Sequence, residues 1–134
     1  MLSAKWIGKY ALIMSPVPDS PAARASKLRR IKLLHTAVWA VVAGAILLLP
    51  VAGGLRHNRL AAGLTVLVLG ECLALALNRG RCPLTNVAEQ YTEDRADNFD
   101  IYLPLWMARY NKQVFGALFA AGELIWLWRC IGRP

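Results

Sequence analysis

Leu33 to Gly53 reads LLHTAVWAVVAGAILLLPVAG, an apolar run without a single charged side chain. At about 1.5 Å of rise per residue, a helix over this run crosses the roughly 30 Å hydrocarbon core of a bilayer. Pro50 and the Gly53-Gly54 pair favour an end to the helix there. The run therefore predicts a membrane-spanning helix, and the rest of the chain is interpreted around it.

Two further apolar stretches have the same character. They are Leu60–Leu77 (LAAGLTVLVLGECLALAL) and Gln113–Ile131 (QVFGALFAAGELIWLWRCI), and Trp126 and Trp128 near the end of the latter suit an interfacial aromatic belt. Hydrophobic residues make up 57 % of the chain, above the roughly 45–50 % of soluble domains. The predicted fold is an all-α, polytopic membrane bundle with three transmembrane helices.

The spans divide the chain into two regions. Residues 1–32 are predicted to be an N-terminal interfacial segment and basic linker, in which Met1–Met14 either lies along the headgroups or frays. Ser15–Ser26 carries three prolines and is expected to contain no helix. Residues 33–131 form the transmembrane domain, with 78–112 as a loop between the second and third spans.

The basic residues predict the orientation. The chain contains sixteen Lys and Arg and eight Asp and Glu, which gives a net charge of +8. Twelve of the sixteen fall on the side of the N-terminus and the central loop, which the positive-inside rule assigns to the cytoplasm. We therefore expect a multi-pass protein of the inner (cytoplasmic) membrane whose basic residues meet lipid headgroups, and no nucleic-acid partner.

Three polar residues fall inside the predicted spans, where ionisable groups normally face a partner or a functional site. His35, Glu71 and Glu123 are expected at about 5, 10 and 16 Å from the cytoplasmic boundary, from the helical rise. If they face one another they form a polar ladder that handles protons or holds the polar end of a quinone, lipid or other apolar ligand. The competing interpretation is structural hydrogen bonding between helices. Two carboxylates and one His are too few to predict a metal, and no cofactor is specified.

The central loop carries the tetrapeptide Cys82-Pro83-Leu84-Thr85, followed by Glu89. A short helix is expected here, with Asn86 as its cap. Cys82 lies near water, where Arg79 and Arg81 would lower its pKa and make it reactive or open to lipid modification. The alternative is a packed turn residue. The acidic run that follows is either a solvated surface or a cation site.

Phe99–Tyr110 is apolar and aromatic but too short to cross a bilayer. It is predicted to be an interfacial or re-entrant piece that feeds the last helix through Pro104, with no fourth span. Phe99, Tyr102 and Trp106 are candidates for docking a partner.

The stretch from Cys82 to Glu89 resembles a family of small, uncharacterised bacterial integral membrane proteins that carry Cys-Pro-Leu-Thr followed by a glutamate. That family also has a His near the start of an early span, matched here by His35. The likeness continues through Tyr102-Leu103-Pro104, where the family tends to have a His and this chain has Ile101. It covers the middle half of the chain and implies architecture, with no activity to carry over.

Two functions are kept as hypotheses, because no catalytic set is recognised. The first is a non-catalytic accessory or assembly subunit that docks on another membrane protein or on a second copy, using the small-residue face from Gly116 to Ala120. The alternative is a binder of quinone, lipid or another apolar ligand at the His35, Glu71 and Glu123 ladder. An enzyme that uses Cys82 or a loop-bound metal is a third, weaker hypothesis.

Overall fold

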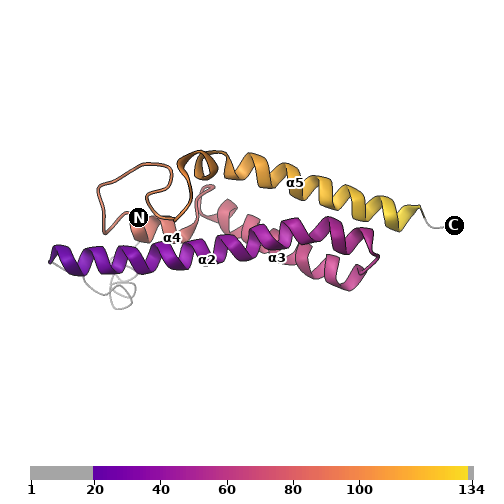
Figure 1. Cartoon of the computed structure of the whole chain (residues 1–134), viewed down its shortest axis with the longest axis horizontal. Helices are drawn as coiled ribbons and strands as arrows, with labels where there is room; N and C mark the ends of the chain where they lie inside the picture. Colours follow the sequence, from indigo (N-terminus) through magenta and orange to yellow (C-terminus); the bar gives the residue numbers. More distant parts are fainter. Residues whose placement is uncertain (1–19, 133–134) are drawn as a thin grey trace, which may run out of the picture.

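The computed structural model describes residues 20–132, and all regular structure in that range is helical. The helices are α2 (Pro21–Gly54), α3 (Asn58–Leu77), α4 (Pro83–Ala88) and α5 (Leu105–Ile131) (Figure 1). Helices α2, α3 and α5 are each long and apolar enough to cross a membrane. The predicted helical bundle with three such helices is confirmed, while the prediction for Met1–Met14 lies outside the described residues.

Helix α2 is longer than a bilayer requires. Its 34 residues correspond to about 51 Å at 1.5 Å per residue, against roughly 30 Å of hydrocarbon. The linker predicted through Ser26 is wrong from Pro21 onward, because proline is well suited to the first helical position and the Ser20 hydroxyl caps the Ala23 N–H at 3.2 Å. The basic residues that directly precede the first span therefore lie on a helix; they are Arg24, Lys27, Arg29, Arg30 and Lys32.

Helix α2 is also the central helix of the bundle. Helix α3 turns back along it, and α5 runs beside its C-terminal half (Figure 1). Leu49 is fully buried at the centre of this packing. The other buried apolar residues of the two core clusters are Ala45, Ile46, Ala52, Ala61 and Val68, which pack with Phe115, Phe119 and Trp126. Large apolar side chains on the outer faces stay exposed, as lipid-facing residues do.

Helices α2 and α5 approach each other closely at two glycines. A Cβ on Gly53 would lie 2.8 Å from the Trp126 Cβ, and one on Gly122 would lie 3.1 Å from the Leu49 Cδ2. A Cβ on Gly116, in contrast, would meet nothing within 4 Å. The small-residue face predicted for helix packing, Gly116 to Ala120, is thus not the contact within this chain.

The central loop folds over the N-terminal half of α2 (Figure 1). Phe99, Ile101 and Leu103 are buried, and the Tyr102 N–H donates to the Thr36 Oγ1 at 3.0 Å. The Lys32 Nζ lies 4.7 Å from the centre of the Tyr102 ring. The loop is therefore attached to α2 near the N-terminal end of the apolar part of that helix.

One prediction within the loop needs correction and one is confirmed. Helix α4 begins at Pro83 with Cys82 as its cap, because proline fits the first helical turn, so Asn86 lies inside the helix and donates to the Asn78 Oδ1 at 2.9 Å. Residues 105–110 are the start of α5, which runs on from Pro104 as one helix to Ile131. The prediction that Pro104 leads a helix straight into the third span is therefore confirmed.

Candidate functional site

The centre of the loop's attachment to α2 is the carboxylate of Asp100. Its side chain is almost fully buried, with 4 % of the residue exposed. The His35 Nδ1 lies 3.1 Å from the Asp100 Oδ2 and 3.2 Å from the Asp100 carbonyl oxygen. The Thr85 hydroxyl donates to the same Oδ2. One carboxylate thus joins α2, α4 and the segment before α5.

These contacts fix the tautomer of the His35 ring. Both neighbours of Nδ1 are oxygen acceptors, so Nδ1 carries the hydrogen and donates to them. In a neutral ring the remaining acceptor is then Nε2. His35 is therefore held in a defined orientation by Asp100, as a second group often holds a catalytic or ligand histidine.

Cys82 lies beside this ring. Burial alone would raise the pKa of its thiol, but interactions with His35 and a hydrogen bond with the Leu84 backbone outweigh burial and lower that pKa below its ordinary value. The prediction that Arg79 and Arg81 would lower it named the wrong groups, since Arg81 instead pairs with Glu89. The loop motif thus serves two contacts: Cys82 and Thr85 face His35 and Asp100, and Glu89 closes the turn.

The pKa of Asp100 is also displaced. Burial works to raise it, but hydrogen bonds from His35 and Thr85 hold the carboxyl pKa below its usual range. Asp100 is therefore ionised wherever the loop is folded at neutral pH. The negative charge of Asp100 thus lies next to the Nδ1–H of His35.

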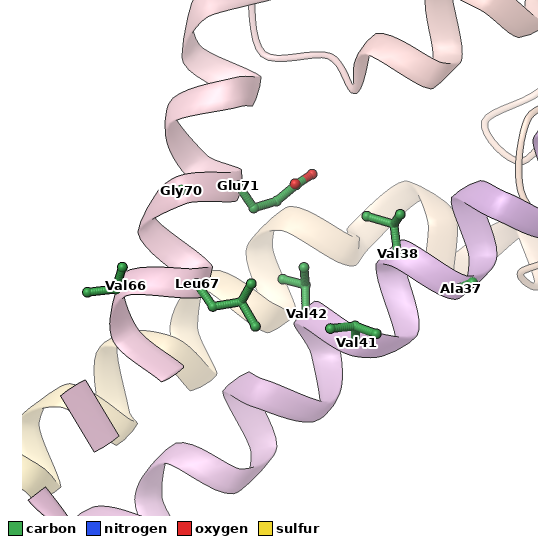
Figure 2. A pocket seen from close by; sticks show the side chains of 8 residues that line it. All are labelled: Ala37, Val38, Val41, Val42, Val66, Leu67, Gly70 and Glu71. Atoms are coloured by element: carbon green, nitrogen blue, oxygen red, sulfur yellow. The ribbon is translucent and has the colours of Figure 1, made fainter. Parts of the chain in front are cut away.

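Glu71 has different surroundings. It lies at one end of an open groove of about 600 Å³ between α2 and α3, lined otherwise by small and aliphatic residues such as Val38, Val42, Val66 and Leu67. Figure 2 shows its carboxylate projecting from α3 across the groove toward α2. Within residues 20–132 no hydrogen bond or ion pair reaches this carboxylate, although its charge acts on Cys82.

Glu123 is satisfied within the chain. The Thr65 hydroxyl donates to its Oε1 at 2.5 Å, so Glu123 joins α5 to α3. Thr65 precedes Glu71 by about 9 Å along α3 at the helical rise. The structure therefore does not unite the three residues of the predicted ladder: His35 joins the loop motif, Glu71 faces the groove, and Glu123 bonds to Thr65.

The acidic run of the loop is dispersed. Asp97 pairs with Arg109 at 2.8 Å, while Asp100 turns inward to His35. In the part of the chain that the structure describes, no three His, Cys, Asp or Glu side chains are grouped to hold a metal ion.

The three aromatic docking candidates also differ. Phe99 is 8 % exposed and so is closed to a partner, whereas Tyr102 and Trp106 are 50 % and 61 % exposed. Asp100 is the site residue that sequence reasoning missed. In the sequence it resembles the other acidic residues of the loop, and only its tertiary contacts distinguish it.

Comparisons with family models, with curated proteins and with solved structures find no match to this chain.

Proposed function

We propose that this chain is a multi-pass protein of a bacterial inner membrane that binds a lipid-like molecule or quinone in the α2/α3 groove. The observation that carries the proposal is Glu71, an ionisable side chain at the end of an apolar groove without a hydrogen-bond partner among residues 20–132. The resemblance of Cys82–Glu89 to small bacterial membrane proteins supports the setting, and the basic residues support a cytoplasmic central loop.

The physical argument is the cost of a carboxylate within a bilayer, at least a few kcal/mol on insertion scales. Such residues normally face a partner, a cavity or a ligand. Glu123 meets this requirement through Thr65. Glu71 lacks such a bond. A ligand whose head group donates a hydrogen bond in the groove would supply the bond that Glu71 lacks.

The groove suits a ligand with an apolar body. A volume of about 600 Å³ is within the roughly 300–1,000 Å³ of small-molecule sites, which are mostly apolar with a few polar groups that fix orientation. The groove lies between two spans, so a ligand reaches it sideways from the bilayer. The apolar body then lies along Val38, Val42 and Val66, with the head at Glu71.

The test is ligand retention. Protein extracted gently from its own membrane is measured by native mass spectrometry, and the bound molecule is identified after organic extraction. Glu71→Leu removes the head-group partner, and we expect about a tenfold loss of occupancy, the effect of one buried hydrogen bond of about 1.4 kcal/mol. Gly70→Leu places a bulky side chain in the groove, since a Cβ there meets nothing within 4 Å. This variant should also lose the bound ligand.

The matched controls lie on the same bundle. Gly63→Leu makes the same change on α3, at a position that is equally open but does not line the groove. Glu123→Gln alters the other intramembrane carboxylate, which already has Thr65. Both should keep the ligand. A wild-type protein that carries no specific molecule, or an equal loss in Gly63→Leu, would reject the proposal.

A second candidate function is the accessory or assembly subunit. It is favoured by the open face from Gly116 to Ala121, where another helix could approach α5 closely. A photo-crosslinking residue at Ala117 should then capture a membrane protein or a second copy in the native membrane. Capture of lipid alone at Ala117 counts against this function.

A further inference from the structure

One cluster of side chains has no role in the ligand binding proposed above. It consists of Cys82, His35 and Asp100. Asp100 accepts from the His35 Nδ1–H. Cys82 caps α4 three residues before Thr85, whose hydroxyl donates to the same Asp100 carboxylate, and His35 is among the groups that act on the Cys82 thiol. A thiol, an imidazole and an orienting carboxylate in this order are the arrangement by which proteins generate a nucleophilic sulfur. Thr85 holds Asp100 from the side of α4.

This cluster lies at the loop end of the groove. His35 and Val38 are three residues apart on α2 and share a face, and Val38 lines the groove. Glu71, at the polar end of the groove, is near enough for its charge to oppose ionisation of the Cys82 thiol. A chain that lies in the groove therefore has its polar end on the side of the bundle that carries Cys82.

We propose that Cys82 accepts an acyl group from a long-chain acyl thioester and that the acyl chain lies in the α2/α3 groove. The inference rests on the proposed function, because it names the class of molecule that the groove holds. Redox chemistry is less well supported, since Cys72, Cys82 and Cys130 are all free and none of them is paired in a disulfide.

The step is an exchange of thioesters. The Nε2 of His35 takes the proton of the Cys82 thiol, and the sulfur attacks the carbonyl carbon of the thioester. The bond from that carbon to the leaving sulfur breaks, and the proton on His35 passes to the leaving thiolate. The products are S-acyl Cys82 and a free thiol, so neither an oxidant nor a reductant is needed.

The residues have distinct roles in this step. Cys82 is the nucleophile and His35 the general base, a role that typically contributes about 10²–10⁴ in rate. Asp100 is a positioning residue, which keeps the hydrogen on Nδ1 and leaves Nε2 as the acceptor.

The experiment uses the full chain in lipid nanodiscs with palmitoyl-coenzyme A as the probe. Intact mass and peptide mapping should place one acyl group on Cys82, released by neutral hydroxylamine. Cys82→Ser should abolish it, while the Cys72→Ser/Cys130→Ser double variant should retain it. His35→Gln, which can still donate to Asp100, should slow acylation about a hundredfold.

A separate readout distinguishes chemistry from folding. Alkylation of Cys82 by iodoacetamide should rise at lower pH in the wild type than in His35→Gln, with melting temperatures compared in parallel. Acyl groups on Cys72 or Cys130, or unchanged acylation in a folded His35→Gln protein, would overturn the assignment. If palmitoyl transfer fails while the groove still retains a ligand lost in Glu71→Leu, only this inference is lost and the proposed function stands.

Discussion

Asp100 is the residue on which the attachment of the central loop depends. Replacing it with Ala removes the acceptor of the His35 Nδ1–H and of the Thr85 hydroxyl. A buried donor that loses its partner costs about 1–3 kcal/mol, so Asp100→Ala should destabilise the loop by about that amount. The Tyr102 amide, which donates to Thr36, should then exchange with solvent faster by about tenfold or more.

The matched control is Asp97→Ala. Asp97 pairs with Arg109 on the surface, where both side chains are about half exposed, and such pairs contribute about 0–1 kcal/mol. Exchange at Tyr102 should barely change. Equal effects of the two substitutions would show that burial of Asp100 has no special role.

The lowered pKa of Asp100 predicts a pH dependence of the same contact. In the folded chain the pKa lies below its ordinary value of about 3.9 because of His35 and Thr85. A group with a depressed folded pKa stabilises the fold fully above its unfolded value, and this stability is lost as pH falls toward the folded value. Protection of the Tyr102 amide should therefore be constant from pH 7 to about pH 5 and decline below about pH 4. Asp100→Asn should lack the decline, and a decline that persists in Asp100→Asn would assign it to another group.

At the scale of elements, the packing of α2 on α5 depends on two glycines. Gly53→Ala places a methyl group 2.8 Å from the Trp126 Cβ and 3.1 Å from its Cα. The backbone must shift to admit it, at a cost typical of overpacking, about 1–3 kcal/mol. Gly116→Ala adds the same methyl in open space and should be neutral or stabilising by up to about 1 kcal/mol. Thermal unfolding in one detergent compares the two, and equal melting temperatures would contradict this close approach.

The elements also show what the sequence could predict. The three apolar helices follow from hydropathy, since the length of an apolar run sets whether it spans. The start of α2 was missed because prolines indicate a break, whereas Pro21 sits where a helix accommodates one. The site was predicted in parts: His35 and Cys82 were each singled out, but their meeting depends on Asp100. The rise per residue gives depth along a helix but not the direction in which a side chain faces. Depth alone therefore groups Glu71 with Glu123, although Glu123 bonds to Thr65, six residues before Glu71 on α3.

At the scale of the whole molecule, the loop and the N-terminal part of α2 must share one side of the membrane, because the Tyr102 N–H bonds to Thr36. The turn between α2 and α3, at residues 55–57, lies at the other end of the bundle (Figure 1). Ten of the thirteen Lys and Arg among residues 20–132 belong to the first side, so the positive-inside rule predicts that this side is cytoplasmic. In a Cys72→Ser/Cys82→Ser/Cys130→Ser background, an impermeant maleimide added to intact spheroplasts should label His57→Cys. The maleimide should label Lys27→Cys and Glu93→Cys only after the spheroplasts are permeabilised. Labelling of Lys27→Cys and Glu93→Cys in intact spheroplasts would reverse the orientation, and labelling of only one of these two would contradict the packing of the loop on α2.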